Sequence, residues 1–273
     1  MKVPLSERPN PRSRDLHRRS TLAVVRLMNA EDARVAAAVR RVLPAVARVA
    51  DLAVAAIRAG GRVLYVGAGT SGRLGVLDAS ECPPTFRAPA RWFQGVIAGG
   101  TAALRRSVEG AEDSRATGAR EMRSRRVEER DLVVGLSASG TTPFVLGAVA
   151  HAKRIGAPTA CVTCVPGSPL AKAARHPIVV RVGPEVLAGS TRLKAGTAQK
   201  MVLNMISTAA MVRMGRVFGN RMSHLQPVNA KLRRRAVSIA STVLGISRAK
   251  AAAALRTHGG DLPSLLDAQA KPR

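Results

Sequence analysis

The stretch GAGTSGRLGVLDASECPPT, residues 67–85, decides the fold of this chain. The apolar residues 63–66 precede it and predict a buried strand, which runs into a glycine-rich loop and then into a helix. Glycines let the backbone approach an anion closely, hydroxyl groups donate hydrogen bonds to it, and a helix N-terminus adds positive partial charge. Glu81 follows, and Pro83-Pro84 predicts a helix end that holds this carboxylate in place. A phosphate cradle beside a fixed carboxylate indicates an enzyme that acts on a phosphorylated metabolite; the alternative is an ordinary glycine-rich βα turn, with Glu81 on a solvated helix end.

A second loop of the same kind follows another apolar segment. Residues 137–142 read Ser-Ala-Ser-Gly-Thr-Thr and come directly after residues 131–136, with Pro143 suited to the first turn of a helix. Neither loop is a Walker A motif. Two such loops at adjacent strand ends would form a site at the carboxyl edge of a sheet.

Apolar segments and helical patterns alternate through the middle of the chain. Short apolar strands separated by helices predict an α/β fold with a parallel sheet covered on both faces. The predicted strands are residues 63–66, 95–98, 132–136, 159–163 and 178–182.

Helices are predicted before and after these strands. Ser20-Thr21 supplies N-cap candidates for a helix through Met28, Asn29 or Asp32 would start the next, and Pro44 predicts a kink or break. Later helices are predicted at residues 198–214, 229–244, 247–257 and 263–270, the last two forming a hairpin that turns at Gly259-Gly260. In the first of these later helices, one face would carry Val202, Met205, Ala209 and Val212, with its methionines filling the core.

The charge of the chain is strongly positive. Its 273 residues include 44 Lys and Arg against 17 Asp and Glu, a formal net charge of +27. This excess favours anionic partners and fast capture of phosphorylated ligands. The basic residues are scattered along helical segments, and aromatic residues, which stack on single-stranded nucleic acid, make up only 2%. We therefore expect a solvated basic surface and no specific nucleic-acid partner.

The remaining composition predicts a cytoplasmic protein without a metal site. The basic N-terminus lacks an apolar signal-peptide core, and no stretch approaches the roughly 20 apolar residues of a membrane span. Three cysteines do not make a disulfide framework. Cys161 and Cys164 have zinc or redox spacing, but no second Cys or His pair stands at ligand spacing, and they overlap a predicted buried strand.

The two loops resemble those of the sugar isomerase (SIS) domain, a phosphosugar-binding α/β fold. Further stretches narrow the resemblance to the N-acetylmuramic acid 6-phosphate etherases, which are related to glucokinase regulatory protein. The resemblance spans nearly the whole chain and rests on residues 67–86, 108–113 (VEGAED), 183–186 (GPEV) and 189–200 (GSTRLKAGTAQK). It implies an N-terminal arm with helices (1–58), an SIS domain (59–225) and a C-terminal helical segment (226–273).

The resemblance also implies an activity and a catalytic pair. The family cleaves the lactyl ether of a phosphorylated amino sugar, N-acetylmuramic acid 6-phosphate, without a metal or organic cofactor, and generally forms homodimers whose sites include partner residues. Matched by motif, the pair is Glu112 as the base that removes the C2 proton and Glu81 as the acid that protonates the C3 ether oxygen. Without the motif, Glu109 and Asp113 compete with Glu112.

Other residues follow from the same resemblance. Glu185 is either a buried, hydrogen-bonded carboxylate or a functional one, and Arg192 and Lys194 either bind substrate or stabilise a loop. The residues implied to hold the substrate or its 6-phosphate are Thr70, Ser71, Ser137, Ser139, Thr142 and Lys194.

The chain departs from the family pattern in places that leave the catalytic pair intact. Thr141 stands where many etherases have Arg, and Arg87 where Gly is usual; Arg221, Ser223 and His224 replace other residues after Asn220. The alternatives are a non-catalytic sugar-phosphate sensor, a phosphosugar isomerase and a nucleic-acid-binding regulator. The joint presence of Glu81 and Glu112 favours catalysis over sensing.

Overall fold

A five-stranded parallel sheet forms the centre of the protein. The computed structural model describes residues 7–224 and 230–270. The strands lie in the order β2-β1-β3-β4-β5, and all neighbours run parallel, which confirms the predicted α/β fold. The second and the last strand each begin two residues earlier than predicted, and the last one ends at Val179 instead of Val182. The bounds are β1 (Val63–Gly67), β2 (Phe93–Ile97), β3 (Leu132–Leu136), β4 (Thr159–Thr163) and β5 (His176–Val179).

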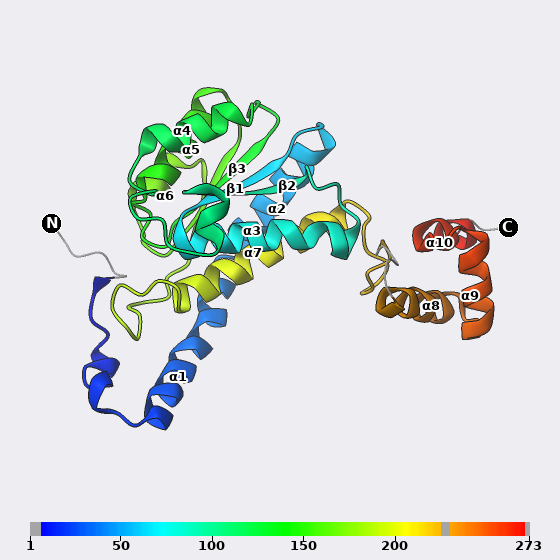
Figure 1. Ribbon diagram of the computed structural model, residues 1–273, viewed down its shortest axis with the longest axis horizontal. Helices are drawn as coiled ribbons and strands as arrows, with labels where there is room; N and C mark the ends of the chain where they lie inside the picture. Colours follow the sequence, from blue (N-terminus) through cyan, green and yellow to red (C-terminus); the bar gives the residue numbers. More distant parts are fainter. Residues whose placement is uncertain (1–6, 225–229, 271–273) are drawn as a thin grey trace. The chain divides into compact units, whose positions relative to one another are not determined.

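Helices cover both faces of this sheet (Figure 1). On one face lie α4 (Arg115–Ser124), α5 (Pro143–Arg154) and α6 (Pro169–Ala173). On the other lie α2 (Leu43–Arg58), α3 (Gly69–Phe86) and α7 (Lys194–Arg213), while α1 (Thr21–Arg40) precedes α2. Among the described residues, the short 3₁₀ helices are η2 (Pro11–Ser13), η3 (Leu16–Arg18) and η4 (Gly100–Leu104). No helix of the described part is long and apolar enough to cross a membrane.

Successive side chains along each strand point to opposite faces of the sheet and pack into a core on each face. Leu64 and Val66 of β1 point to the face where they pack with Phe144 and Val145 of α5. Tyr65 points to the other face, where a methyl group added to Gly75 of α3 would lie 3.0 Å from its Cβ. A larger residue at position 75 would therefore push α3 off the sheet.

The chain divides into two compact units. The first comprises residues 1–80 and 91–210 and contains the sheet. The second comprises residues 81–90 and 211–273 and contains α8 (Ala230–Leu244), α9 (Arg248–Thr257) and α10 (Leu262–Ala270), which share a small apolar core. The predicted helical hairpin is confirmed: α9 and α10 flank the turn at Gly259-Gly260. Of the predicted helix 229–244, Asn229 lies outside the described residues.

Two helix predictions need correction, whereas the break predicted at Pro44 is confirmed: α1 ends at Arg40, and α2 begins at Leu43 with Pro44 in its first turn. Helix α1 runs unbroken from its Ser20 cap to Arg40, because nothing between Met28 and Asp32 breaks it. Helix α3 does not end at Pro83-Pro84 but continues to Phe86, since Pro83 still accepts a hydrogen bond from the Arg87 amide at 2.8 Å. Glu81 therefore lies inside a helix.

The face of α7 expected to be buried is largely open. Val202 is buried, but it shares its stripe with Ile206 and Ala210, at the four-residue spacing of a helix. Met205 is half-buried, Ala209 is exposed, and Val212 is 50% exposed, so these three do not share a buried face with Val202. The predicted role of the methionines as core residues is confirmed for Met211, which is fully buried.

Candidate functional site

The first glycine-rich loop joins β1 to α3 by a tight turn. Gly67 leaves no room for a side chain, since an added Cβ would lie 2.6 Å from the amide nitrogen of Gly72. The Gly72 amide donates to the carbonyl of Ala68 at 3.1 Å, which starts the helix directly after the strand. Thr70 and Ser71 lie in its first turn and are half-buried. The loop thus presents two hydroxyl groups at the positive end of α3.

The second loop joins β3 to α5 and is held by its own hydroxyl groups. Ser137 Oγ lies 2.9 Å from Thr142 Oγ1 and accepts the Gly140 amide at 3.0 Å. Ser139 Oγ lies 2.8 Å from Thr141 Oγ1. Gly140 has φ +69°, which a residue with a side chain adopts at a cost. Ser137 is 3% exposed, whereas Ser139 and Thr142 are half-buried and more accessible to a ligand.

The two loops lie at neighbouring strand ends. Strands β1 and β3 pair in parallel, with Gly67 beside Leu136, the last residue before the second loop. Because the chain leaves β1 toward β2 on one side and continues from β3 toward β4 on the other, this point is where the strand order reverses. Ligands of open α/β sheets bind at such a switch point.

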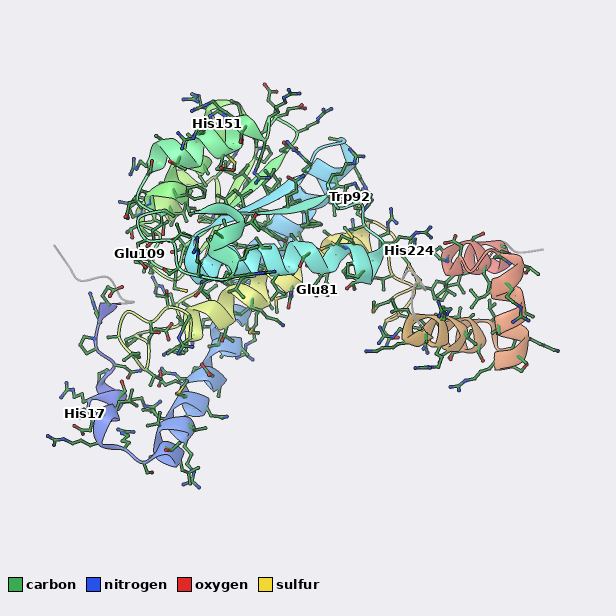
Figure 2. All side chains as sticks on the ribbon, viewed as in Figure 1. His17, Glu81, Trp92, Glu109, His151 and His224 are labelled. Carbon is green, nitrogen blue, oxygen red and sulfur yellow. The ribbon has the colours of Figure 1, made fainter. Side chains whose placement is uncertain are left out.

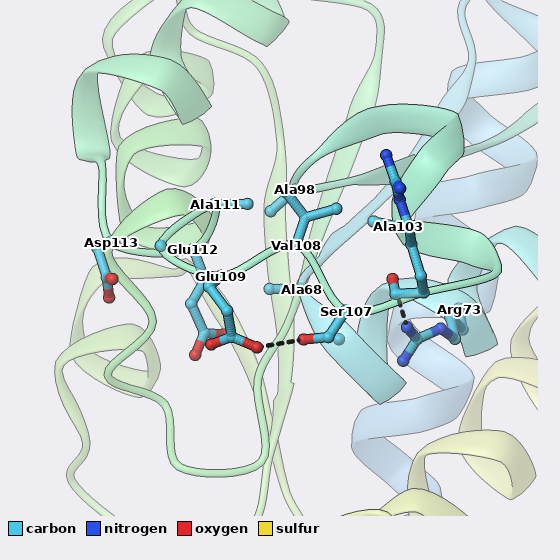
Figure 3. Close-up of a pocket in the computed structure, with 13 residues that line it drawn as sticks. Ala68, Arg73, Ala98, Ala103, Ser107, Val108, Glu109, Ala111, Glu112 and Asp113 are labelled. Atoms are coloured by element: carbon cyan, nitrogen blue, oxygen red, sulfur yellow. Dashed lines mark hydrogen bonds between the residues drawn. The ribbon is translucent and has the colours of Figure 1, made fainter.

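A cavity of about 230 Å³ opens beside the first loop. Ala68, Ala98 and Ala103 form part of its wall, together with residues 106–113. In Figure 3 the carboxylates of Glu109 and Glu112 lie on one side of these small side chains and Arg73 on the other.

Backbone contacts fix the segment that carries Glu112. The amide of Phe144, in the first turn of α5, donates to the Glu112 carbonyl at 2.9 Å. Ser107 Oγ donates to Glu109 Oε1 at 2.7 Å. Glu112 is exposed at the cavity and has no such hydroxyl partner among the described residues. Its carboxylate is thus accessible to a ligand bound beside the second loop.

Glu81 lies on α3 and belongs to the second unit (Figure 2). Its side chain is exposed. It follows Gly69 by twelve residues of one continuous helix, a rise of about 18 Å. Along this helix, Glu81 is therefore far from the first loop, which lies at the start of α3.

Lys194 is fully enclosed. Its side chain is 1% exposed, forms an ion pair with Glu31 of α1 and donates to the Pro184 carbonyl at 2.7 Å. Asn10 Nδ2 donates to the same Glu31 carboxylate at 3.0 Å. Burial raises the pKa of Glu31, but hydrogen bonds from Lys194 and Arg12 outweigh this and lower it to about 2. The sequence motif did not disclose this cluster.

Glu185 serves as a cap for α7. Its carboxylate accepts the amide hydrogens of Lys194 at 3.1 Å and Ala195 at 2.9 Å. Burial raises its pKa, and these backbone bonds offset part of the rise. The contacts support its interpretation as a buried, hydrogen-bonded carboxylate.

Cys161 and Cys164 are buried free thiols. Burial raises the pKa of each to about 12, which disfavours the thiolate that metal binding or redox chemistry needs. Within residues 7–224 and 230–270, no three His, Cys, Asp or Glu side chains group as a metal site requires.

Two basic residues of the pocket were not among the sequence candidates. Arg73 and Arg106 line the cavity but belong to no motif that assigns arginine a role. Arg73 donates to the carbonyls of Leu104 at 3.3 Å and Arg106 at 3.2 Å, a link across thirty-odd residues that only the fold reveals.

Comparisons with known proteins agree with this fold. Residues 45–153 match the model of the glucokinase regulatory protein N-terminal SIS domain, and residues 113–209 match that of the SIS domain. An N-acetylmuramic acid 6-phosphate etherase of Yersinia pestis (strain Pestoides F) is 53% identical over 252 residues, 92% of this chain and 85% of the relative. One from Yersinia pseudotuberculosis serotype O:1b (strain IP 31758) is equally similar. A phosphoheptose isomerase structure from Francisella tularensis shares the fold with TM-score 0.54 at 17% identity, over 71% of this chain and 100% of that one.

Proposed function

The chain belongs to the N-acetylmuramic acid 6-phosphate etherase family, and from that premise we propose which residues carry its reaction. The protein is a carbon–oxygen lyase of peptidoglycan recycling. It cleaves the D-lactyl ether of N-acetylmuramic acid 6-phosphate and yields N-acetylglucosamine 6-phosphate and D-lactate. The observation that carries the assignment is Glu112, a pocket carboxylate held by its backbone beside the hydroxyl-rich second loop.

The 6-phosphate binds at the two loops. Thr70 and Ser71 donate from the first turn of α3, and Ser139 and Thr142 from the second loop, with Ser137 holding that loop in shape. The N-terminal ends of α3 and α5 add positive partial charge from neighbouring strand ends. Lys194 affects this site indirectly, by positioning the start of α7, because its ammonium is already paired with Glu31.

Elimination uses both carboxyl groups. The open-chain sugar carries an aldehyde at C1, which acidifies the proton on C2. The Glu112 carboxylate takes that proton, the C3–O bond breaks, and the carboxylic acid of Glu81 protonates the departing ether oxygen, so that D-lactate leaves with its hydroxyl group.

Water addition then completes the reaction. The Glu81 carboxylate takes a proton from water, whose oxygen bonds to C3 of the unsaturated aldehyde. Glu112 returns its proton to C2, so both groups regain their starting forms. Their opposite roles require separated pKa values.

The working form is a homodimer in which each site takes Glu81 from the other chain. Helix α3 alone separates Glu81 from the first loop by about 18 Å, which favours a site completed by a second copy. An open apolar groove along α2 and α7 offers a surface for that copy, since soluble chains rarely leave large apolar patches uncovered. Its apolar lining includes Leu43, Val46, Ala50, Met201 and Met205.

We place the enzyme in the cytoplasm. Its three cysteines are buried free thiols, the state that a reducing compartment maintains.

D-lactate release from N-acetylmuramic acid 6-phosphate tests the assignment. Glu112→Gln should lower the rate by about 10²- to 10⁴-fold, as loss of a general base does. Glu109→Gln and Asp113→Asn, which change carboxylates lining the same cavity, should keep far more activity. A loss that falls on Glu109 or Asp113 instead would overturn the choice of Glu112. Binding without any lactate release by the unaltered chain would favour a sensor.

A further inference from the structure

The substrate carries a second anion for which the proposed site has no partner so far. Its lactyl group ends in a carboxylate, which the sugar product lacks. The two loops account for the phosphate, and the two glutamates for proton transfer. A group that recognises the carboxylate would select the ether substrate over its own sugar product.

The cavity beside Glu112 has the size and wall chemistry of a lactyl pocket. Its volume of about 230 Å³ suits a three-carbon substituent, and Ala68, Ala98 and Ala103 give a surface for a methyl group. Figure 3 shows carboxylates on one side of these alanines and Arg73 on the other. A carboxylate would be repelled from the acidic side, which Glu109, Glu112 and Asp113 form, and attracted to the arginine side.

Arg106 also lines the cavity, its backbone beside the Arg73 guanidinium, and its own exposed guanidinium is available. Arg73 already donates to two backbone carbonyls, one of them that of Arg106 itself. Within the described residues, the Arg106 guanidinium has no hydrogen bond or ion pair. Arg73 therefore fixes the backbone that carries Arg106, while the Arg106 side chain remains unengaged at the cavity.

We propose that Arg106 binds the lactyl carboxylate of the substrate, with Arg73 as its positioning residue. A guanidinium matches a carboxylate with two parallel hydrogen bonds. It also offsets the charge of the three nearby acids as the lactate anion leaves. This inference deepens the proposed function and rests on the placement of the reacting carbons at Glu112.

Two substrates separate carboxylate recognition from catalysis. We would compare kcat/KM for N-acetylmuramic acid 6-phosphate with that for its lactyl carboxamide, which keeps the shape and removes the charge. The unaltered enzyme should prefer the acid by about tenfold or more, the range of a hydrogen bond to a charged group. Arg106→Gln should remove most of this preference by losing activity on the acid, and Arg106→Lys should retain part of it.

Arg105→Gln is the matched control, because Arg105 is the exposed neighbour that does not line the cavity. It should keep the wild-type preference. If Arg106→Gln lowers both activities equally, or leaves the preference intact, Arg106 does not recognise the carboxylate. Glu112→Gln should silence both substrates; if it does not, the proposed base is wrong whatever Arg106 shows.

Discussion

Lys194 shows, at the scale of one residue, how a cation in a substrate-binding motif can serve the fold. Its ammonium is buried against Glu31, which lies 163 residues earlier in the chain. A motif read along the sequence offers no means of finding such a partner. Phosphate contact by Lys194 stays a prediction, and the observed contacts favour a positioning role for the start of α7.

Glu31→Gln should destabilise the protein by about 3–5 kcal/mol, because it leaves the Lys194 ammonium buried without its counter-charge. Urea unfolding at pH 7 measures the change. Arg34→Gln is the matched control: it removes another Glu31 partner, but one whose side chain is 63% exposed, so its cost should stay below about 1 kcal/mol. Equal effects of the two variants would contradict the buried pair.

The lowered pKa of Glu31 predicts that the stability of the protein depends on pH. The pKa of Glu31 is lowered from 4.5 to about 2 in the folded protein, so its contribution is fully present above the unfolded value. That contribution should fall as pH drops from about 4.5 toward 2. The difference in unfolding free energy between the unaltered chain and Glu31→Gln should therefore become smaller over this pH range. A difference that stays constant would contradict the stabilising role of the Glu31 carboxylate.

At the scale of elements, close packing of α4 on α5 positions the segment that carries Glu112. An added Cβ at Gly147 of α5 would lie 2.0 Å from the Arg115 carbonyl oxygen, and one at Gly118 of α4 would lie 1.9 Å from that of Phe144. Because the Phe144 amide holds the Glu112 carbonyl, the spacing of these helices sets the position of Glu112.

Gly147→Ala should therefore move α4 away from α5, lower stability by about 1–3 kcal/mol and reduce kcat more than it raises KM. Thermal unfolding and steady-state kinetics measure both effects. Ala150→Ser, an exposed change on the same helix, should leave both near wild type. Loss of stability with kcat unchanged would show that this packing does not position Glu112.

The sequence predicted which strands and helices are present better than it predicted where the helices end and which of their faces are buried. Buried strands in a parallel sheet are continuous apolar runs, so all five were found, and the loops after β1 and β3 were correctly placed at neighbouring strand ends. The end of α3 was missed because helical hydrogen bonding resumes after Pro84. The face of α7 was missed because apolar periodicity does not distinguish an apolar face in the core from one that the same chain leaves uncovered. The cavity lining comes from two separate stretches, residues 68–73 and 98–113, that only the fold brings together.

At the scale of the whole molecule, we propose that each site takes residues from two chains. Glu112 lines a cavity of the sheet-containing unit, and Glu81 belongs to the second unit. The open groove along α2 and α7 leaves apolar side chains without cover in one chain. A symmetric dimer would cover such a surface and bring the two carboxyl groups from different copies to each site.

Mixed dimers test this arrangement. Glu81→Gln and Glu112→Gln chains should each be inactive alone, but a mixed dimer has one site with both carboxyl groups intact. With random pairing, about half of the dimers are mixed and each has one intact site of two, so about a quarter of wild-type activity should return. Co-expression with two affinity tags isolates the mixed dimer. No recovery in a confirmed mixed dimer would place both groups in one chain.

The most direct test of the central claim is hydrogen exchange at C2 of the substrate in D₂O. Glu81→Gln should retain the base, and so exchange the C2 proton for deuterium while releasing almost no D-lactate. Glu112→Gln should neither exchange nor release. Exchange that survives in Glu112→Gln would contradict the account, because the C2 proton would then have another acceptor.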